Sequence, residues 1–556
     1  MRKLFLIVSF GLTSGLLALS VWHHRVLWAF VIVGPILFAG FQDYFQKGKA
    51  IRRNFPVLGR FRYWFETIRP EINQYFVESN SDGVPFSREQ RSLVYQRAKK
   101  EIDTLPFGTQ QDVYAVGYEW INHSLAPTHI DPSQLRISIG GPDCRQPYSA
   151  SIFNISAMSY GALSKNAILA LNGGAKDGGF AHNTGEGGLS PYHLENGGDL
   201  IWQIGTGYFS CRNRDGSFNA ELFQENAADA RIKMIEIKLS QGAKPSHGGI
   251  LPAKKVTLEI SKIRGVPMGF DVLSPPAHSE FSTPIGLLEF VQKLRTLSGG
   301  KPVGFKLCLG KRREFIAICK AMIKTGITPD FISVDGGEGG TGAAPLEFSN
   351  HVGTPGIDGL VFVHNALTGF GLRDRIKILN SGKVTSGFGV IQRLALGADA
   401  LYSARGMMLA LGCIQALRCN TNHCPTGVAT QDPGLVAGLV VRDKRARIAN
   451  FHHETVSSVS HMIEAMGLAS PAALRPWHIQ KRVGPYETKN YGEIFQFLKE
   501  GELLLATIPE AFRKAFDGAI AESFQHPSDL VQPVAQLEKA ENAETLKRKV
   551  VAASAA

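Results

Sequence analysis

Between about residues 150 and 405, the sequence repeats one local pattern eight times. In each repeat, a short run of β-branched and aromatic residues ends in glycine or small polar residues, and a helical stretch follows. Strands that alternate with helices are typical of a parallel sheet, and eight of them can close an α/β barrel, the (β/α)8 or TIM barrel. The predicted strands are 153–156, 180–182, 200–204, 234–238, 303–307, 331–334, 376–379 and 400–402. A ninth candidate, 270–273, falls in the long excursion between the fourth and fifth strands.

The rest of the chain is divided around this barrel by changes in composition. We assign residues 146–435 to the barrel, 46–145 to a helical cap or linker region, and 436–527 to C-terminal helices packed on the barrel. Residues 528–556 are rich in Ala, Lys and Glu, which predicts a solvated helix or a disordered tail.

Composition excludes several classes of protein. With 556 residues, 44% of them hydrophobic, the chain can bury a large core and is not globally disordered. Seven cysteines are too few for a disulfide scaffold. The formal net charge of +12 favours acidic partners or an anionic membrane surface. No zinc-finger pattern, RNP signature or basic stretch with interleaved aromatics indicates nucleic-acid binding.

Two uncharged apolar runs, 4–22 and 26–41, stand at the start of the chain. The first is long enough to cross a bilayer as a helix. Basic residues flank the pair at 2–3 and 47–53, so the positive-inside rule leaves both ends in the cytoplasm. We therefore expect a membrane hairpin over 1–45, a multi-pass cell-membrane location and a cytoplasmic catalytic domain. A cleaved signal peptide, a single anchor, or an interfacial or re-entrant second segment are the alternatives.

Polar residues are concentrated just beyond the ends of the predicted strands. In a closed barrel these ends meet at one face, where such folds carry their active sites. Any single glycine loop is weak evidence, because loops need glycine for positive φ. The joint placement predicts one site on the rim. Its candidate segments are 158–161, 183–188, 238–244, 335–337 and 381–383.

The last two rim loops are suited to a phosphate group. Ser381, Gly382 and Lys383 follow the seventh strand, and Ala404 and Arg405 follow the eighth. Backbone N–H groups and cationic side chains in these two loops match the usual phosphate position of the fold. The alternative is a pair of ordinary turns that carry solvated bases.

Four further charged residues are candidates at the rim. A lysine inside an apolar strand, Lys306, is costly unless it faces an anion, and it could stabilise the negative edge of a reduced flavin. Glu186 could transfer a proton or orient an imine, while Lys238 and Lys244 could hold a dicarboxylate. The alternative is that these residues form salt bridges on the rim.

Three cysteines follow the eighth predicted strand with the spacing Cys-x5-Cys-x4-Cys, at Cys413, Cys419 and Cys424. Three thiolates can bind three irons of a cuboidal cluster, although this is not the run found in bacterial ferredoxins. Zinc would need a fourth ligand, and the adjacent His423 is awkwardly placed for that role. Iron–sulfur, zinc and no metal all remain open on spacing alone.

At this point the residues resemble a known family, the glutamate synthases, in their flavin-binding synthase domain. The similarity covers about half of the chain, and the full chain resembles the short, membrane-anchored bacterial members. The matching motifs are MSYGALS (158–164), NTGEGG (183–188), EIKLSQGAKP (236–245), LPAKKV (251–256), SPPAH (274–278), GGEGGTGAAP (336–345), GLRDRI (371–376) and ALGCIQALRCNTNHCPTGVATQDP (410–433).

The resemblance implies an FMN-containing barrel with a [3Fe–4S] cluster that forms glutamate from 2-oxoglutarate and ammonia through 2-iminoglutarate. By motif, the cluster ligands are Cys413, Cys419 and Cys424. The implied 2-oxoglutarate site contains Glu186, Lys238 and Lys244. The implied flavin contacts are Met158, Ser159, Lys306, Ser381, Gly382, Lys383, Ala404 and Arg405.

Two departures from the family pattern affect substrate and nitrogen source. The large members open with a catalytic cysteine in a glutaminase domain, whereas Arg2 and an apolar segment follow residue 1 here. We therefore expect free ammonia or a separate amidotransferase to supply nitrogen. The family loop AKPGEGGQLP reads AKPSHGGILP at 243–252, which places His247 and Ile250 where the family has glutamate and glutamine.

No G-x-G-x-x-G fingerprint of a Rossmann unit is present, so we expect an electron donor such as ferredoxin rather than direct NAD(P)H binding. Two other functions remain open. One is an FMN and iron–sulfur oxidoreductase that acts on another oxo acid or amine. The other is a non-catalytic, membrane-anchored electron-transfer subunit.

Overall fold

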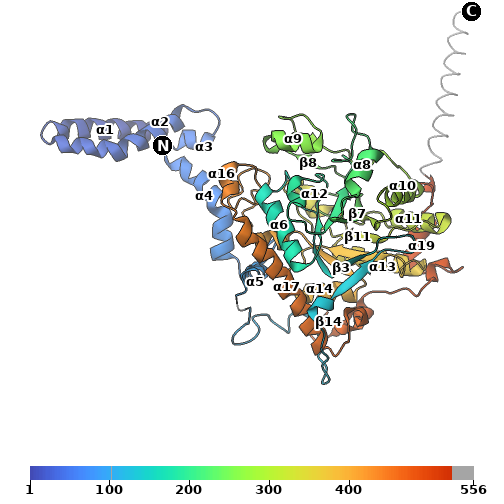
Figure 1. Cartoon of the computed structure of the whole chain (residues 1–556). Helices are drawn as coiled ribbons and strands as arrows, with labels where there is room; N and C mark the ends of the chain where they lie inside the picture. Colours follow the sequence, from blue (N-terminus) through green and yellow to red (C-terminus); the bar gives the residue numbers. More distant parts are fainter. Residues whose placement is uncertain (102, 529–556) are drawn as a thin grey trace, which may run out of the picture. The chain divides into compact units, whose positions relative to one another are not determined.

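The computed structural model describes residues 1–101 and 103–528 and contains two compact units, Met1–Arg88 and Glu89–Ala556 (Figure 1). The second unit contains the predicted barrel, and the first contains the predicted membrane hairpin. Apart from Ser528, the predicted tail 528–556 lies outside the described residues.

Eight parallel strands of the second unit close a barrel in chain order, and the last pairs back to the first. Each predicted strand overlaps an observed one, so the (β/α)8 prediction is confirmed. The ninth candidate also forms a strand outside the barrel, where β9 (Val272–Leu273) pairs antiparallel with β8 (Ile250–Leu251). The barrel strands are β4 (Phe153–Ile155), β5 (His182–Asn183), β6 (Leu200–Ile204), β7 (Ile232–Lys238), β10 (Val303–Leu307), β11 (Phe331–Asp335), β12 (Lys377–Ser381) and β13 (Ala400–Ser403).

The barrel strands are buried on both faces, because helices cover the outside while side chains fill the inside. Every residue of β6 and β10 is buried, as continuous apolar runs in parallel sheets predict. The helices that follow the barrel strands along the chain are α6 (Lys165–Gly178), α7 (Pro191–Leu194), α8 (Ala220–Ala227), α9 (Leu258–Arg264), α10 (Pro284–Leu297), α11 (Arg312–Thr325), α12 (Leu346–His351), α13 (Gly356–Gly369), α14 (Gly387–Ala395) and α15 (Arg405–Leu411).

A hairpin of β2 (Arg136–Ile139) and β3 (Tyr148–Ser151) closes the N-terminal end of the barrel. Ile139, Tyr148 and Ala150 belong to one core cluster with residues from the barrel strands, such as Met234 and Leu379. Because this end is plugged, the opposite end, where the strands terminate, is left for the functional site.

The longest helix in the described part of the second unit, α17 (Val441–Ala465), packs against α6. Gly174 of α6 permits the close approach, since a Cβ atom there would lie 2.5 Å from the Cβ of Ile448. A second sheet joins β1 (Glu119–Ile121) to β14 (Ile479–Arg482) and β15 (Thr488–Asn490). The remaining helices are α5 (Arg88–Lys99), α16 (Pro433–Ala437), α18 (Tyr491–Ile494), α19 (Glu510–Asp517) and the 3-10 turns Pro132–Gln134, Ala253–Lys255, Pro471–Ala473, Pro476–His478 and Glu502–Leu504.

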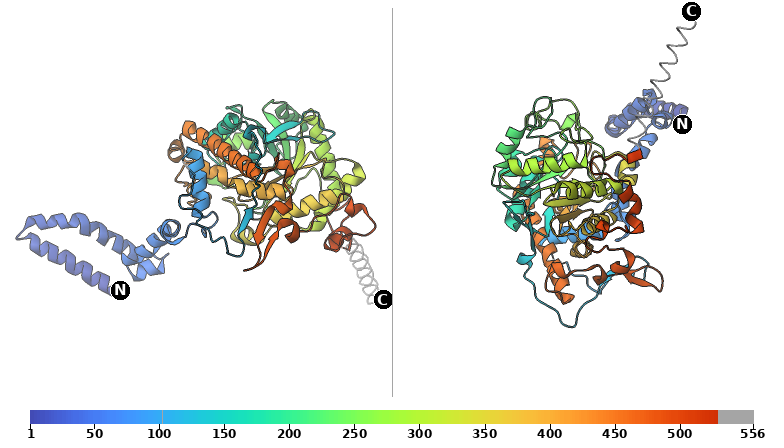
Figure 2. Two further views of the ribbon diagram at one scale, coloured as in Figure 1. Left: turned by 90° about the horizontal axis from the view of Figure 1, so that it is seen from below. Right: turned by 90° about the vertical axis from the view of Figure 1, so that its right-hand side faces the viewer.

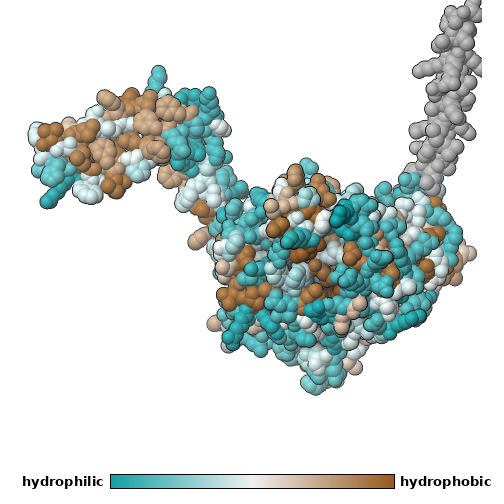
Figure 3. All heavy atoms as spheres, turned by 45° about the horizontal axis from the view of Figure 1, so that its top comes forward, coloured by the Kyte–Doolittle hydropathy of each residue, from teal (hydrophilic) through white to brown (hydrophobic). Residues whose placement is uncertain are grey.

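The first unit begins with two apolar helices that run side by side in opposite directions (Figure 2). In α1 (Arg2–Ser20) and α2 (Phe30–Phe45), the rings of Phe5 and Phe41 pack 5.3 Å apart. Brown, apolar residues cover much of the hairpin surface in Figure 3. By length and composition, Arg2–Ser20 and His24–Phe45 could each cross a membrane. The unit continues through α3 (Ala50–Asn54), α4 (Leu58–Ile72) and a π-helical turn (Asn73–Val77).

We predict that Gly174→Ala destabilises the protein. In an ordinary exposed helix, the replacement of glycine by alanine would instead stabilise the helix by up to about 1 kcal/mol. The added methyl group would overlap Ile448 and the carbonyl of Arg445, and such overpacking costs roughly 1–3 kcal/mol. The melting temperature of the purified chain should fall by a few degrees. Gly484→Ala is the control, because the nearest atom to its Cβ would be 3.5 Å away. Equal melting temperatures for the two variants would contradict the close α6–α17 contact.

Candidate functional site

Strand register brings the predicted rim residues together at the C-terminal end of the barrel. Lys238 of β7 is the register partner of Lys306 of β10. Two strands further on, Asp335 of β11 is the partner of Ser381 of β12. Residues up to 143 positions apart in the sequence are thereby placed at the same end of four consecutive barrel strands.

One predicted cluster centres on Glu186, which lies in the loop after β5. Lys238 forms an ion pair with it, with Nζ 2.7 Å from Oε2. Burial acts to raise the pKa of Glu186, but Lys238, Lys244 and Arg264 outweigh burial and hold the pKa below its usual value. Glu186 is therefore a carboxylate that faces three cations.

The cations of this cluster are themselves perturbed. Burial lowers the pKa of Lys244 to about 8, with Glu186 opposing the shift and Lys238 adding to it. Burial also lowers the pKa of Arg264 to about 10 against the attraction of Glu186. With the three cations charged, one carboxylate offsets one of them, and the cluster has a net charge of about +2. Such a site is complementary to a dianion.

A loop closes over this cluster. Lys244 Nζ donates to the carbonyl of Gly248, and a Cβ atom at Gly249 would lie 2.8 Å from Glu186 Oε1. The cavity left between the loop and the cluster is about 10 Å³, roughly the space of one water molecule. His247 and Ile250 both belong to this loop, and Ile250 pairs with Leu273 across β8 and β9. A substrate therefore needs the loop to move.

His278 contacts the backbone of Lys238. Its Nε2 lies 2.9 Å from the carbonyl oxygen of Lys238, and its Nδ1 lies 3.1 Å from the Tyr208 hydroxyl. Burial lowers the pKa of His278 to about 4, so the imidazole is neutral near pH 7. It fixes the end of β7 through hydrogen bonds and adds no charge to the cluster.

A second cluster contains Lys306, whose side chain is buried. Its Nζ lies 3.2 Å from Oδ2 of Asp335, and Asp335 also accepts a hydrogen bond from Ser381 Oγ. Burial acts to lower the pKa of Lys306, but Asp335 and then Glu236 outweigh it and raise the pKa. The compensating anion that the sequence required for this lysine is present within the protein.

The predicted phosphate loops also meet. Burial lowers the pKa of Lys383, and the neighbouring Arg405 lowers it further while Glu338 opposes. Arg405 follows Ala404, the N-cap of α15, and donates to the carbonyl of Glu338. Gly382 has φ of +147°, and a Cβ atom there would lie 2.6 Å from Glu338 Oε1. The cradle accommodates an anionic oxygen beside two cations, so its residues fit the phosphate of FMN.

The segment predicted to flank a flavin ring is held next to the Glu186 loop. The amide of Met158 donates to the carbonyl of Asn183 (3.0 Å), and His193 Nε2 lies 3.0 Å from the carbonyl of Met158. Gly185 has φ of +66°, and a Cβ atom there would lie 2.9 Å from the amide of Ser159. Glycine at 185 is thus required for this close packing.

The three predicted cluster cysteines lie on the loop between α15 and α16. All are free thiols, and in the described part of the chain no group of three or more His, Cys, Asp or Glu side chains is arranged to hold a metal ion. Burial, with smaller contributions from Cys419 and Cys424, raises the pKa of Cys413 to about 11. Three neighbouring thiols are the donor set of a three-cysteine iron–sulfur site, and in that respect the loop fits one.

Several residues of the site were missed from the sequence. Glu236 of β7 is completely buried and accepts hydrogen bonds from Asn183 (2.8 Å) and Gln203 (2.7 Å), and also from Ser333. A charged residue within the apolar strand IKMIEIK is the same signal that identified Lys306. Arg264 carried no such signal, because it ends an ordinary helix. Asp335 lies in a segment predicted for the rim, but its pairing with Lys306 was not predicted.

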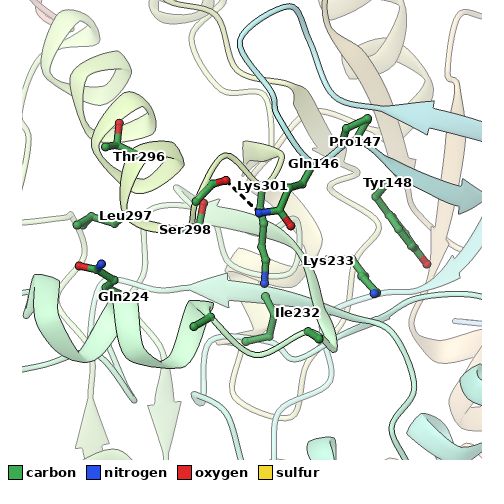
Figure 4. Close-up of a pocket in the computed structure, with 13 residues that line it drawn as sticks. Gln146, Pro147, Tyr148, Gln224, Ile232, Lys233, Thr296, Leu297, Ser298 and Lys301 are labelled. Atoms are coloured by element: carbon green, nitrogen blue, oxygen red, sulfur yellow. Dashed lines mark hydrogen bonds between the residues drawn. The ribbon is translucent and has the colours of Figure 1, made fainter.

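A much larger cavity, about 610 Å³, lies at the other end of the barrel (Figure 4). Its lining residues precede or begin β3 and β7, or precede β10. Gln146 donates to the carbonyl of Gly299 in its wall (3.0 Å). Lys301 donates to the backbone carbonyl of Asp229 (2.8 Å). Since the strand ends that carry the charged clusters are opposite, this cavity is separate from the candidate site.

Comparison with known proteins identifies relatives along most of the chain. Residues 128–469 match the family model described as the conserved region in glutamate synthase. The glutamate synthase large subunit-like protein YerD of Bacillus subtilis is 38% identical over 495 residues, which is 81% of this chain and 94% of that protein. The archaeal glutamate synthase [NADPH] of Methanocaldococcus jannaschii is 37% identical over 322 residues, 58% of this chain and 60% of the relative.

Among solved structures, the flavin-binding domain of baker's yeast flavocytochrome b2 aligns with a TM-score of 0.40 at 12% identity. The alignment covers 75% of this chain and 85% of that domain.

We predict that Glu236→Leu lowers the free energy of unfolding by roughly 3 kcal/mol, because three buried donors lose a common acceptor and Lys306 loses a nearby negative charge. Glu236→Gln, which keeps an acceptor oxygen, should cost less. Glu225→Leu on the exposed side of α8 is the matched control and should change stability little. Denaturant unfolding of the purified variants measures the difference, and a cost for Glu236→Leu no larger than for the control would contradict the network.

Proposed function

Because this chain belongs to the glutamate synthase family and is an oxidoreductase of that type, we propose that it reductively aminates 2-oxoglutarate to glutamate through 2-iminoglutarate. The observation that carries the proposal is the cluster of Glu186 with Lys238, Lys244 and Arg264. Its net charge of about +2 is complementary to the two carboxylates of 2-oxoglutarate. The YerD relative, of which this chain covers 94%, is described only as similar to the glutamate synthase large subunit.

We assign the binding of the two carboxylates to Lys244 and Arg264. Arg264 is buried, and its Nε has no hydrogen-bond partner, so a carboxylate would satisfy a group that is otherwise costly to bury. Its Nη2 is fixed by the carbonyl of Tyr160 at 3.0 Å. Of these two residues, Lys244 belongs to the loop that must move for the substrate to enter.

Glu186 and Lys238 are assigned to the nitrogen end of the substrate. The Glu186 carboxylate accepts a hydrogen bond from Lys238 and can equally accept one from ammonia or an imine N–H. An ionised carboxylate near a bound amine can also take up its proton. Lys238 keeps the opposite charge beside this carboxylate, and His278 holds the end of β7 that carries it.

We propose that FMN binds at the rim, with its phosphate at Ser381, Gly382, Lys383, Ala404 and Arg405 and its ring near Met158, Ser159 and Lys306. The fit of the glycine cradle and its two cations supports the phosphate position. When bound, FMN supplies a hydride to the imine carbon. Lys306, paired with Asp335, provides positive charge beside the ring.

We propose that Cys413, Cys419 and Cys424 bind a [3Fe–4S] cluster, which supplies one-electron transfer when bound. Lys255 anchors this loop through the carbonyl of Cys419 (2.8 Å). The basic chain, with net charge +12, suits an acidic electron donor such as ferredoxin. Free ammonia or a separate amidotransferase is the proposed nitrogen source, and the apolar hairpin is proposed to anchor a cytoplasmic catalytic unit to the cell membrane.

A second candidate function is favoured by Ile250. An aliphatic side chain stands where the family has an amide, and an unpaired buried acceptor would cost roughly 1–3 kcal/mol. The alternative is therefore an FMN and iron–sulfur oxidoreductase that acts on another oxo acid or amine. A membrane-anchored electron-transfer subunit without amino-acid synthesis is the non-catalytic alternative.

The deciding experiment uses the full chain purified without oxygen. Visible and EPR spectra should show flavin and a three-iron cluster, and chemically reduced enzyme should form glutamate from 2-oxoglutarate and ammonia. Turnover of another oxo acid in place of 2-oxoglutarate would favour the second function. Cofactor signals without any product would favour the electron-transfer subunit, and a chain without flavin would remove both enzymatic proposals.

We predict that Lys244→Ala raises the KM for 2-oxoglutarate about 10- to 100-fold, the loss expected for one charge-assisted hydrogen bond. The kcat should change much less, because the lost contact binds the substrate in its ground state. Lys244→Arg should restore most of the affinity. Lys254→Ala, ten residues further on and exposed, is the control and should leave KM unchanged.

Affinity for 2-oxoglutarate should also depend on pH. Lys244 has a pKa of about 8, below the usual lysine value, so its charge is present below that pH and is lost above it. Between pH 7 and pH 9 the KM should rise roughly tenfold if only the charged form binds. The Lys244→Arg enzyme should show a flat profile over this range, and a steep rise in that variant would assign the titration to another group.

A further inference from the structure

The helix α4 is amphipathic along its whole length. At 100° per residue, the six large apolar side chains fall within one third of the helix circumference. They are Leu58, Phe61, Trp64, Phe65, Ile68 and Ile72. The opposite side carries Tyr63 and Thr67, so the two faces differ sharply.

The apolar face of α4 is exposed to solvent. Relative exposure is 55% for Leu58, 53% for Phe61, 54% for Trp64 and 53% for Phe65. A soluble protein rarely leaves such a continuous row of large apolar residues uncovered. The face therefore needs an occupant.

Charge indicates what that occupant is. Residues 46–77 contain seven Lys and Arg and only two Asp and Glu. Arg62 and Arg69 lie at the edge of the apolar face, where long side chains can reach past apolar groups towards phosphate oxygens. An apolar stripe bordered by cations is the pattern of helices that lie in the interface of an anionic membrane.

The start of α4 is tied to the end of α2 by one buried carboxylate, Asp43. Arg60 Nε donates to its Oδ2 at 2.7 Å, Arg52 Nε donates to its Oδ1 at 2.7 Å, and the amide of Val57 donates to Oδ2 at 3.2 Å. Arg60 also donates to the carbonyl of Ala39 (3.0 Å). These contacts couple the direction of α4 to the end of the second apolar helix.

We propose that α4 lies in the membrane interface and binds anionic phospholipid, with its apolar face among the acyl chains and Arg62 and Arg69 on lipid phosphates. The Asp43 cluster holds this helix in a fixed direction to the hairpin. The helix α4 would thus be the third element of the first unit in contact with the membrane, in addition to α1 and α2.

The test is photocrosslinking of the full chain in vesicles of phosphatidylcholine alone or of phosphatidylcholine with about one third phosphatidylglycerol. Benzoylphenylalanine replaces Phe65 on the apolar face or Thr67 on the opposite face. Lipid adducts are quantified by mass spectrometry. Position 65 should give at least fivefold more lipid adduct than position 67, and a variant with the probe at Phe61 should behave like position 65.

A probe at Phe10 in the first apolar helix serves as the positive control for membrane insertion. Equal lipid adduct at positions 65 and 67 would overturn the proposal. So would adducts of positions 61 and 65 only with protein, whether with the rest of the same chain or with a second copy. Melting temperatures equal to that of the parent show that the probe variants are folded.

Two double variants test whether lipid binding by α4 depends on its arginines. Each arginine near an anionic surface strengthens association about fivefold, the equivalent of about 1 kcal/mol. The double variant Arg62→Gln, Arg69→Gln should lose most of the extra adduct at position 65 that phosphatidylglycerol produces. Lys176→Gln, Lys262→Gln removes two exposed cations elsewhere and should not. Equal adduct with and without phosphatidylglycerol would refute anionic-lipid binding.

Discussion

Closure of the parallel barrel is the constraint on which the rest of the second unit depends. Because β13 pairs back to β4, all eight strand ends are brought to one rim. The β2–β3 hairpin fills the other end with apolar residues. Polar side chains at the strand ends are therefore confined to a single region, even though they come from loops spread over some 250 residues.

Concentrating charges at one rim requires that each buried charge be compensated. Lys238 and Lys306 stand next to each other in register, and each has its own carboxylate, Glu186 and Asp335. Below them, Glu236 is satisfied by neutral donors and also stabilises the charge of Lys306. The cluster around Glu186 retains excess positive charge, whereas the positive charge of Lys306 is already paired with the Asp335 carboxylate.

The first unit follows a different physical rule. Its helices leave apolar surface exposed instead of burying it, and its one deeply buried charge, Asp43, holds a turn between helices. An arrangement of this kind is stable when lipid surrounds it, because lipid would then bury the apolar faces of α1, α2 and α4. The second unit builds its core from its own chain, whereas the first unit would complete its core with lipid.

Much of this protein could be predicted from its sequence. Local periodicity located all eight barrel strands and the extra strand β9, because buried parallel strands are short continuous apolar runs ended by glycine. Glu186, Lys238 and Lys306 were identifiable as charges placed at or within strand ends. Tertiary structure alone decided which groups meet: the pairing of Lys306 with Asp335, the inclusion of Arg264 in the Glu186 cluster, and the hydrogen bonds of Glu236 with Asn183, Gln203 and Ser333. Those contacts depend on strand register and on loops that return from distant positions, and a local sequence pattern carries no information about either.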